Sequence, residues 1–418
     1  MVNSLAHIFW LVIPNNVMRS RLLVFTENYS RGGGNRYMLD LVRALSDDFV
    51  EIIVASNPGG IFPEELSRLP SKAKVLNLKI ASKNKLRINK LKYFNDSLFV
   101  RVGRAILLLF LEPLLFLVNQ IVFFRLILKV KPSEILICNG GYPGGTSCLT
   151  LAWTSKIFRI PTSMSIVSTP TARRRYLSNL ESQIDLAVWS SCKIVITNCD
   201  SASQLLIKLR GLPNSKAAVI YNGVVDIEIS LLKNYSARQS SDKIVIGFVS
   251  RLEKAKGVFV LFEAFRELVS RFENLELVYF GSGNAQEDLS LLIQRNGLVG
   301  KVKMEGHHFG EISQVLSQID VYVSPSFWEG LPYSLVEAMR SGLAIVATNV
   351  GGTEEALKDS ISGLIVHPDS SESLMDALTR VIVSPEMLTR LGNAARESYL
   401  EKFQYYDFEQ RVQKLFKS

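Results

Sequence analysis

Histidine and cysteine are both scarce in this chain of 418 residues, which holds four of each. No two cysteines form a Cys-x-x-Cys pair, and no histidine stands near a cysteine at metal-ligand spacing, so the common zinc motifs are excluded. Each cysteine is flanked by apolar or small residues, which predicts buried free thiols in a reducing compartment. The four are Cys138, Cys148, Cys192 and Cys199.

The chain also lacks the fingerprint of a dinucleotide oxidoreductase and the pattern of a signal peptide. Its first glycine cluster is Gly32-Gly33-Gly34 rather than Gly-x-Gly-x-x-Gly. The apolar stretch at the N-terminus has neither a basic leader nor a small-residue cleavage site. We therefore expect residues 1–20 to be an extension, folded sequence to begin at Arg21, and the protein to reside in the cytoplasm.

Acidic residues are outnumbered, with 39 Asp and Glu against 48 Lys and Arg and a net charge of +9. This balance favours acidic partners, and we expect phosphates and anionic lipid rather than nucleic acid. Hydrophobic residues at 47 % and charged residues at 21 % are typical of a globular protein. The length is too great for one compact core and predicts two domains of about 200 residues each.

Short β-branched runs alternate with helical stretches from residue 21 onward, which predicts two doubly wound, Rossmann-like α/β domains. We place them at 21–225 and 243–399, joined by the polar linker 226–242. The aromatic-rich tail 399–416 is expected to form one helix, so that 400–418 packs back on the first domain. In such sheets ligands bind at the carboxyl ends of the strands, which here face the cleft between the domains.

The strongest functional signal is FWEGLPYSLVEAM at 327–339, which follows a predicted strand. A proline at the expected first helical position places Glu329 before the helix and Glu337 about a turn and a half inside it. Helical side chains lean toward the N-terminus, so both glutamates are expected at one mouth, beside the amides of Gly330 and Leu331. Two carboxylates suit sugar hydroxyls, and a helix end suits phosphate. The alternative is an ordinary capped helix with solvated glutamates.

A second signal is SRLEKAKG at 250–257, directly after the first strand of the second domain. Arg251 can grip two phosphate oxygens and Lys256 adds a mobile charge, so the turn is predicted to cradle a diphosphate. A solvated basic turn is the alternative, but the position at a strand end favours the cradle. Gly281 and Gly283 end another strand and admit the close approach of a ligand.

Two further strand–turn–helix segments give weaker signals. In Gly351-Gly352-Thr353-Glu354, Thr353 is expected to cap a helix while Glu354 reaches a ligand. The glycines at 32–34 precede a helix and occupy a position that suits anion binding.

The second domain resembles the retaining GT-B glycosyltransferases of family 4, the group 1 glycosyltransferases. The matching segments are SRLEKAKG, FGSG, FWEGLPYSLVEAM and GGTEE, while ENYSRGGGNRYMLDL and IYNGVVD match the first domain more loosely. The resemblance, which covers residues 21–400, implies two Rossmann-like domains that face a central cleft. It also implies a hexosyltransferase that moves a sugar from a nucleotide-diphosphate sugar to a glycan or lipid-linked acceptor in polysaccharide or glycolipid biosynthesis.

The resemblance further implies roles for the site residues. Arg251 and Lys256 would bind the donor diphosphate, Glu329 would orient the donor sugar, and Glu337 would hold the nucleotide ribose. No metal or other cofactor is expected, because the cationic side chains neutralise the charge of the leaving phosphate. The remaining residues of the implied site are Gly281, Gly283, Gly330 and Leu331 on the donor side, with Gly32 and Gly33 near the transferred sugar and the acceptor.

One departure from the family is the lack of a histidine in the stretch 164–170, where many relatives carry a histidine or acid near the reacting carbon. In this family the departing phosphate is thought to help take the acceptor proton, so the identity of a catalytic base stays open. Two alternative functions also stay open: a GT-B-fold sugar-nucleotide 2-epimerase, and a non-catalytic sugar-nucleotide-binding or membrane-scaffold protein.

The segment 72–131 predicts contact with an anionic membrane surface, because it holds 13 Lys and Arg but two acids. Within it, 105–124 has about the length of a bilayer span, although Glu112-Pro113 at its centre disfavours a true span. A wholly buried helix is the second interpretation. An apolar face at the lipid interface, held by the basic residues, is the third and favoured one. Arg173-Arg174-Arg175 is expected to extend the basic patch or to grip an acidic acceptor.

Overall fold

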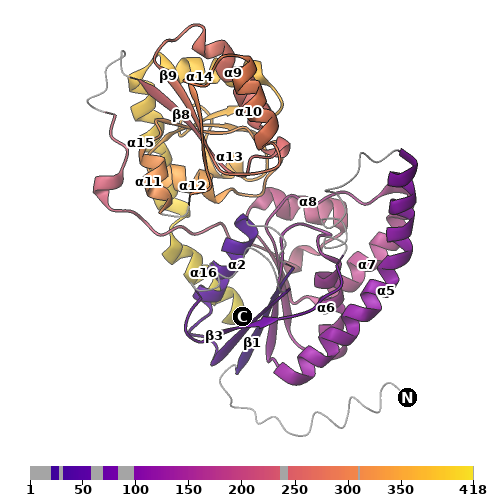
Figure 1. Ribbon diagram of the computed structural model, residues 1–418. Helices are drawn as coiled ribbons and strands as arrows, with labels where there is room; N and C mark the ends of the chain where they lie inside the picture. Colours follow the sequence, from indigo (N-terminus) through magenta and orange to yellow (C-terminus); the bar gives the residue numbers. More distant parts are fainter. Residues whose placement is uncertain are drawn as a thin grey trace, which may run out of the picture.

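The structure, a computed structural model, describes residues 20–27, 32–57, 69–82, 98–235, 243–308 and 311–417, which form two α/β lobes (Figure 1). Residues 1–19 of the expected extension and the basic cluster at 83–92 lie outside these ranges. The predicted doubly wound architecture is confirmed, since each lobe is built on one parallel sheet with helices between its strands.

The N-terminal lobe has a seven-stranded parallel sheet in the order β3-β2-β1-β4-β5-β6-β7. Its inner strands are largely buried because helices cover both faces, as parallel sheets require, whereas the edge strands β3 and β7 have no buried residue. The bounds are β1 Arg21–Thr26, β2 Glu51–Ser56, β3 Ala73–Asn77, β4 Glu134–Asn139, β5 Thr162–Ile166, β6 Ile194–Thr197 and β7 Ala217–Val219.

The direction of the crossovers decides which helices cover which face of this sheet. From β1 the chain passes to β2 on one side of it in the sheet, whereas from β4 it passes through β5 to β6 in the opposite direction across the sheet. Because such crossovers are right-handed, α2 covers one face of the sheet and α6 and α7 cover the other. The helix α6 packs between α5 and α7, and these three form one layer. The helices are α2 Gly33–Ala44, α5 Leu98–Val130, α6 Thr146–Ile157, α7 Ser178–Ser191 and α8 Asp200–Arg210.

The C-terminal lobe has a six-stranded parallel sheet in the order β10-β9-β8-β11-β12-β13. Its strands are β8 Ile244–Val249, β9 Leu275–Phe280, β10 Val302–Gly306, β11 Val321–Ser324, β12 Ala344–Thr348 and β13 Leu364–Val366. Its helices are α9 Val258–Val269, α10 Gln286–Arg295, α11 Ile312–Ser317, α12 Tyr333–Arg340, α13 Thr353–Ala356, α14 Ser371–Ile382 and α15 Pro385–Lys402.

The prediction of one helix over 399–416 is wrong, because the chain breaks there as it returns to the first lobe. Helix α15 ends at Lys402 and α16, Tyr405–Lys417, begins three residues later. Between them Gln404 forms a bridge with Val224, and the amide of Tyr405 donates to the carbonyl of Val224 at 3.0 Å. Helix α16 then packs on α2 in the N-terminal lobe (Figure 1).

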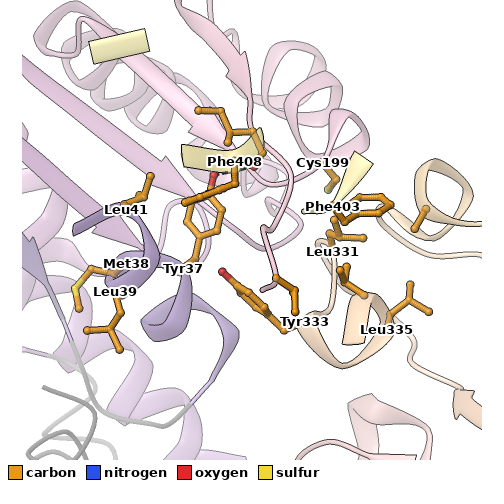
Figure 2. Close-up of a cluster of buried hydrophobic side chains, with 14 of the residues drawn as sticks. Tyr37, Met38, Leu39, Leu41, Cys199, Leu331, Tyr333, Leu335, Phe403 and Phe408 are labelled. Atoms are coloured by element: carbon orange, nitrogen blue, oxygen red, sulfur yellow. Dashed lines mark hydrogen bonds between the residues drawn. The ribbon is translucent and has the colours of Figure 1, made fainter. Parts of the chain in front are cut away.

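One apolar core extends from the N-terminal lobe into the C-terminal lobe. It joins Tyr37 and Met38 of α2 to Leu331, Tyr333 and neighbouring residues of the other lobe (Figure 2). The two lobes therefore meet through buried side chains at the start of α12.

Candidate functional site

The predicted donor residues gather where the order of strands reverses in the C-terminal sheet. Strands β8 and β11 are neighbours although they are far apart in sequence, which defines the topological switch point at which such sheets bind ligands. The loop 250–257 follows β8 and the loop 325–332 follows β11. The amide of Phe327 donates to the carbonyl of Ala255 at 2.9 Å, so the two loops are held together.

Gly257 makes this close packing possible. Its φ is +73°, and a Cβ at this position would lie 1.9 Å from the carbonyl oxygen of Pro325. Any other residue would be strained and would also collide with backbone, so the glycine fixes how closely the two loops approach.

Lys256 and Glu329 form an ion pair between these loops. The ammonium of Lys256 contacts Oε1 of Glu329, and the hydroxyl of Ser326 donates to the same oxygen at 3.1 Å. Both side chains are largely buried, at 13 % and 16 % exposed. The structure thus brings together the cation expected for phosphate and the carboxylate expected for the donor sugar.

Arg251 lies on the same loop but has a different partner. Its guanidinium pairs with Glu253 at 2.5 Å and is 44 % exposed. It is therefore accessible to a ligand, whereas Lys256 is enclosed. Its role in binding a diphosphate stays a prediction.

Gly281 and Gly283 are approached closely by the chain itself. A Cβ on Gly281 would lie 1.9 Å from the carbonyl oxygen of Ser250, and one on Gly283 would lie 2.2 Å from that of Leu252. The end of β9 is therefore packed against the Arg251 loop, so both glycines shape the predicted cradle. Direct contact of these glycines with a ligand stays a prediction.

Glu337 faces the other lobe rather than solvent. Its side chain is 4 % exposed, and Oε1 accepts a hydrogen bond from Arg36 of α2 at 2.5 Å. One turn earlier on α12, Tyr333 donates its hydroxyl to Asp40 of α2 at 2.7 Å. The alternative of a solvated glutamate at 337 is therefore wrong.

The loop between the two glutamates is fitted into the N-terminal lobe. A Cβ on Gly330 would lie 2.3 Å from the carbonyl oxygen of Val167. The carbonyl of Leu331 accepts from the side-chain amides of Asn198 at 3.1 Å and Asn222 at 2.6 Å. Both asparagines are buried and were not predicted as site residues. Their positions just after β6 and β7 could have indicated them.

The segment 351–355 also links the two lobes through hydrogen bonds. The amide of Gly352 donates to the carbonyl of Gly330 at 2.8 Å, and Glu355 accepts from the amides of Asp200 and Ser201 at the start of α8. The capping role expected of Thr353 is wrong, because Gly352 is the residue that precedes the helix. Glu354 accepts from Asn349 at 2.8 Å.

The glycine cluster of the first lobe opens toward α12. Gly33 is the first residue of α2, and a Cβ there would lie 3.6 Å from the ring of Tyr333. A Cβ on Gly32 would have no contact within 4 Å among the described residues. The structure therefore places Gly32 and Gly33 beside the helix that carries Glu337.

A carboxylate of the first lobe was missed in the sequence. Glu27 follows β1, next to the switch point between β1 and β4, and accepts from the amide of Ser147 at 3.1 Å and the hydroxyl of Ser82 at 3.2 Å. An acid directly after the first strand was the signal that could have indicated it.

Arg173 and Arg174 are not free to form the expected basic patch. Arg173 pairs with Asp185 at 2.8 Å and Arg174 with Glu181 at 2.6 Å. Both carboxylates are buried, and Arg210 contacts each of them. This network holds the segment after β5 against α7.

Within the described part of the chain, no group of three or more His, Cys, Asp and Glu side chains is arranged to hold a metal ion. All four cysteines are buried free thiols, as predicted.

Comparison with known proteins places this geometry in a class. The model of the family described as Glycosyl transferases group 1 matches residues 234–398, and that of Glycosyltransferase Family 4 matches 31–226. An uncharacterized glycosyltransferase of Methanocaldococcus jannaschii is 29% identical over 62% of this chain and 70% of its own length. Alpha-D-kanosaminyltransferase of Streptomyces kanamyceticus is 31% identical, but the match spans 37% of this chain and 40% of that enzyme.

The fold of the whole chain also has solved counterparts. Anabaena HepE, crystallised in complex with UDP, superposes with a TM-score of 0.69 at 18% identity, over 95% of this chain and 99% of HepE. Two parallel-sheet lobes that meet at their switch points, with these neighbours, define an enzyme of the GT-B glycosyltransferase class. The chain belongs to the group 1 glycosyltransferases, the family also described as family 4.

Proposed function

We propose that this enzyme transfers a hexose, with retention of anomeric configuration, from a nucleoside-diphosphate sugar to a glycan or lipid-linked acceptor. The reaction would serve polysaccharide or glycolipid biosynthesis at the cytoplasmic face of a membrane. The observation that carries the proposal is the ion pair of Lys256 with Glu329 at the C-terminal switch point. In this ion pair, the cation proposed to bind phosphate is in direct contact with the carboxylate proposed to bind the sugar.

Each residue has a distinct task in this proposal. Lys256 and Arg251 stabilise the negative charge that develops on the leaving diphosphate, and the enclosed position of Lys256 strengthens its effect. Glu329 accepts hydrogen bonds from the donor sugar, and Glu337 accepts from the ribose. UDP is the first nucleotide to test, because HepE was solved with UDP.

Retention is proposed to proceed by substitution on one face of the sugar. The leaving phosphate takes the proton of the acceptor hydroxyl as the new glycosidic bond forms and the bond to phosphate breaks. This route needs no histidine, which suits the stretch 164–170 at the end of β5 and just after it, where no histidine stands.

The decisive experiment screens UDP-, ADP- and GDP-sugars for stabilisation of the purified protein, since a ligand that binds the folded state raises its melting temperature. The donor that stabilises the protein is then incubated with simple glycan and lipid-phosphate acceptors. NMR of the product should show the anomeric configuration of the donor. An inverted product, or the absence of stabilisation by every donor, would contradict the proposal.

We also propose that the transfer needs no metal, because Lys256 and Arg251 supply the positive charge at the diphosphate. Incubation with excess EDTA should therefore change the initial rate of transfer by less than about twofold, as side chains replace the role of a divalent ion. A rate that disappears with EDTA and returns with Mg²⁺ or Mn²⁺ would contradict this proposal.

The α5–α6–α7 layer supports association with a membrane surface. Pro113–Val130 of α5 is long and apolar enough to cross a membrane, but 28 % of it is buried in the protein, so a wholly buried helix is wrong. Three helices expose large apolar side chains on this layer, with fractions between 40 % and 63 %. They are Leu114, Leu117, Val118, Ile121 and Leu128 on α5, Trp153 and Ile157 on α6, and Leu180, Ile184 and Leu186 on α7.

Charge on the same layer favours an anionic partner. Arg125, Lys129 and Lys156 are exposed there, whereas the acids of α7, Glu181 and Asp185, are buried against arginines. An apolar surface with basic residues and no exposed acid among these described side chains suits the interface of an anionic bilayer. We propose that this layer lies on such a bilayer.

The length of α5 connects this surface to the acceptor. A helix of 33 residues is about 50 Å long, far more than a strand of six residues at about 20 Å. The C-terminal end of α5 leads into the start of β4, so the excess length projects past the carboxyl ends of the strands, where the two lobes meet. A bilayer on α5 would therefore lie beside the cleft, which supports a lipid-linked acceptor.

Replacement of Leu117 and Ile121 by Asp should weaken binding to vesicles of phosphatidylcholine and phosphatidylglycerol by about tenfold or more, because two charges then face the lipid. Flotation measures bound protein at low and high salt, and wild-type binding should fall as salt rises. Leu291→Asp, on exposed α10 of the other lobe, is the matched control and should bind as wild type does. Equal binding of the wild type to neutral vesicles would contradict the proposal.

A further inference from the structure

Four side chains form a polar cluster between the lobes. On α2, Arg36 and Asp40 stand one turn apart, and on α12, Tyr333 and Glu337 have the same spacing. Arg36 donates to Glu337 at 2.5 Å, and Tyr333 donates to Asp40 at 2.7 Å. The guanidinium carbon of Arg36 also lies 4.2 Å from the centre of the Tyr333 ring. In Figure 2, Tyr333 projects toward Tyr37 and Met38 of α2.

Burial makes three members of this cluster depend on the opposite lobe. Asp40, Tyr333 and Glu337 are 5 %, 7 % and 3 % exposed. Burial raises the pKa of Asp40 above its ordinary value, against the lowering effect of Arg36. A buried carboxylate that loses its partner is strongly unfavourable, so the cluster stabilises the arrangement in which the lobes are closed.

Arg36 engages one of the two carboxylate oxygens of Glu337. Its guanidinium engages Oε1. A carboxylate accepts hydrogen bonds at both oxygens, so Glu337 can hold Arg36 at Oε1 and accept from a ribose hydroxyl at Oε2.

We propose that Arg36 is a positioning residue that orients Glu337 for the nucleotide ribose and so couples donor binding to closure of the lobes. The inference rests on the proposed function, in which Glu337 holds the ribose. Because Arg36 belongs to the other lobe, the carboxylate is oriented when the lobes are closed. By thermodynamic linkage, a ribose that binds the oriented carboxylate stabilises closure to the same extent.

Calorimetric titration with UDP and with dideoxy-UDP, which lacks the ribose hydroxyls, tests this role. Arg36→Gln should weaken UDP binding by about tenfold, which is the effect of losing one charge-assisted interaction. Binding of dideoxy-UDP should change by less than twofold, and Arg36→Lys should recover part of the affinity for UDP. In X-ray scattering without ligand, Arg36→Gln should have a larger radius of gyration than the wild type.

Arg396→Gln is the matched control, because Arg396 forms an ion pair of similar length with Asp226 of the linker, at 2.5 Å and 2.7 Å, rather than with Glu337. It should leave the affinity for both nucleotides unchanged. Equal losses for UDP and dideoxy-UDP in Arg36→Gln would overturn the positioning role, as would UDP binding as tight as in the wild type. If the wild type binds neither UDP, ADP nor GDP, the proposed function itself fails, and the inference fails with it.

Discussion

Replacement of Lys256 by Ala should lower kcat/KM for the donor sugar by roughly 10²–10³-fold, the range seen when one preorganised electrostatic contact is removed from an active site. Lys256 is 13 % exposed and contacts Glu329, so its loss removes the charge that faces the leaving diphosphate. It also leaves Glu329 without its cation, so the carboxylate would repel the phosphate. Steady-state transfer assays and calorimetry with the nucleoside diphosphate measure both consequences.

Lys254 supplies a matched control for this prediction. It lies in the same short 3-10 helix, Lys254–Lys256, but its side chain is exposed. Lys254→Ala removes the same charge from the same turn and should change kcat/KM by less than about threefold, because an exposed charge is screened by water and salt. Similar losses in both variants would show that the turn acts through its net charge, which would contradict a specific contact by Lys256.

Replacement of Arg210 by Met should destabilise the N-terminal lobe by about 3 kcal/mol, at the lower end of the cost of breaking a buried ion pair. The guanidinium is 2 % exposed and contacts Glu181 at 2.9 Å and Asp185 at 3.5 Å. It also donates to the carbonyl of Thr171 at 2.8 Å, so the segment after β5 should loosen as well. Urea unfolding followed by tryptophan fluorescence measures the loss in the transition of this lobe.

The loss should be full at pH 7 and should shrink as the pH falls from 4.5, the ordinary pKa of a glutamate, toward about 3. Burial raises the pKa of Glu181, but Arg174 and Arg210 lower it more, so it lies below its ordinary value. A carboxylate with a lowered pKa stabilises the fold at neutral pH, and this contribution disappears as the pH falls through its folded pKa. Arg266→Met, an exposed arginine paired with Glu263 and Glu267, is the control and should cost less than about 1 kcal/mol. An equal loss at both pH values would contradict the ionic explanation.

The sequence was most informative where a pattern depends on neighbouring residues alone. The β-branched runs that alternate with helical stretches from residue 21 onward form the strands of both sheets. Helix α8 ends at Arg210 before Gly211, whose φ of +68° is the left-handed cap that glycine favours. Alternation of strands and helices was therefore enough to predict two doubly wound lobes.

Local pattern was a poor guide where distant parts of the chain compete for the same residues. The break between α15 and α16 follows from the pairing of Gln404 with Val224, about 180 residues away. No residue pattern near 404 predicts this break. The three arginines at 173–175 looked like a surface patch, but two of them pair with carboxylates on α7 that come close only in the folded lobe.

The sequence by itself determined the two sheets, their helices, and the loops that carry Arg251, Lys256, Glu329 and Glu337, because strand ends and turns are encoded in short runs of residues. Tertiary structure decided which side chains meet: Lys256 with Glu329 across two loops, and Glu337 with Arg36 across two lobes. Such contacts join residues 73 and 301 positions apart, so they depend on how closely two loops and two lobes pack rather than on any local preference.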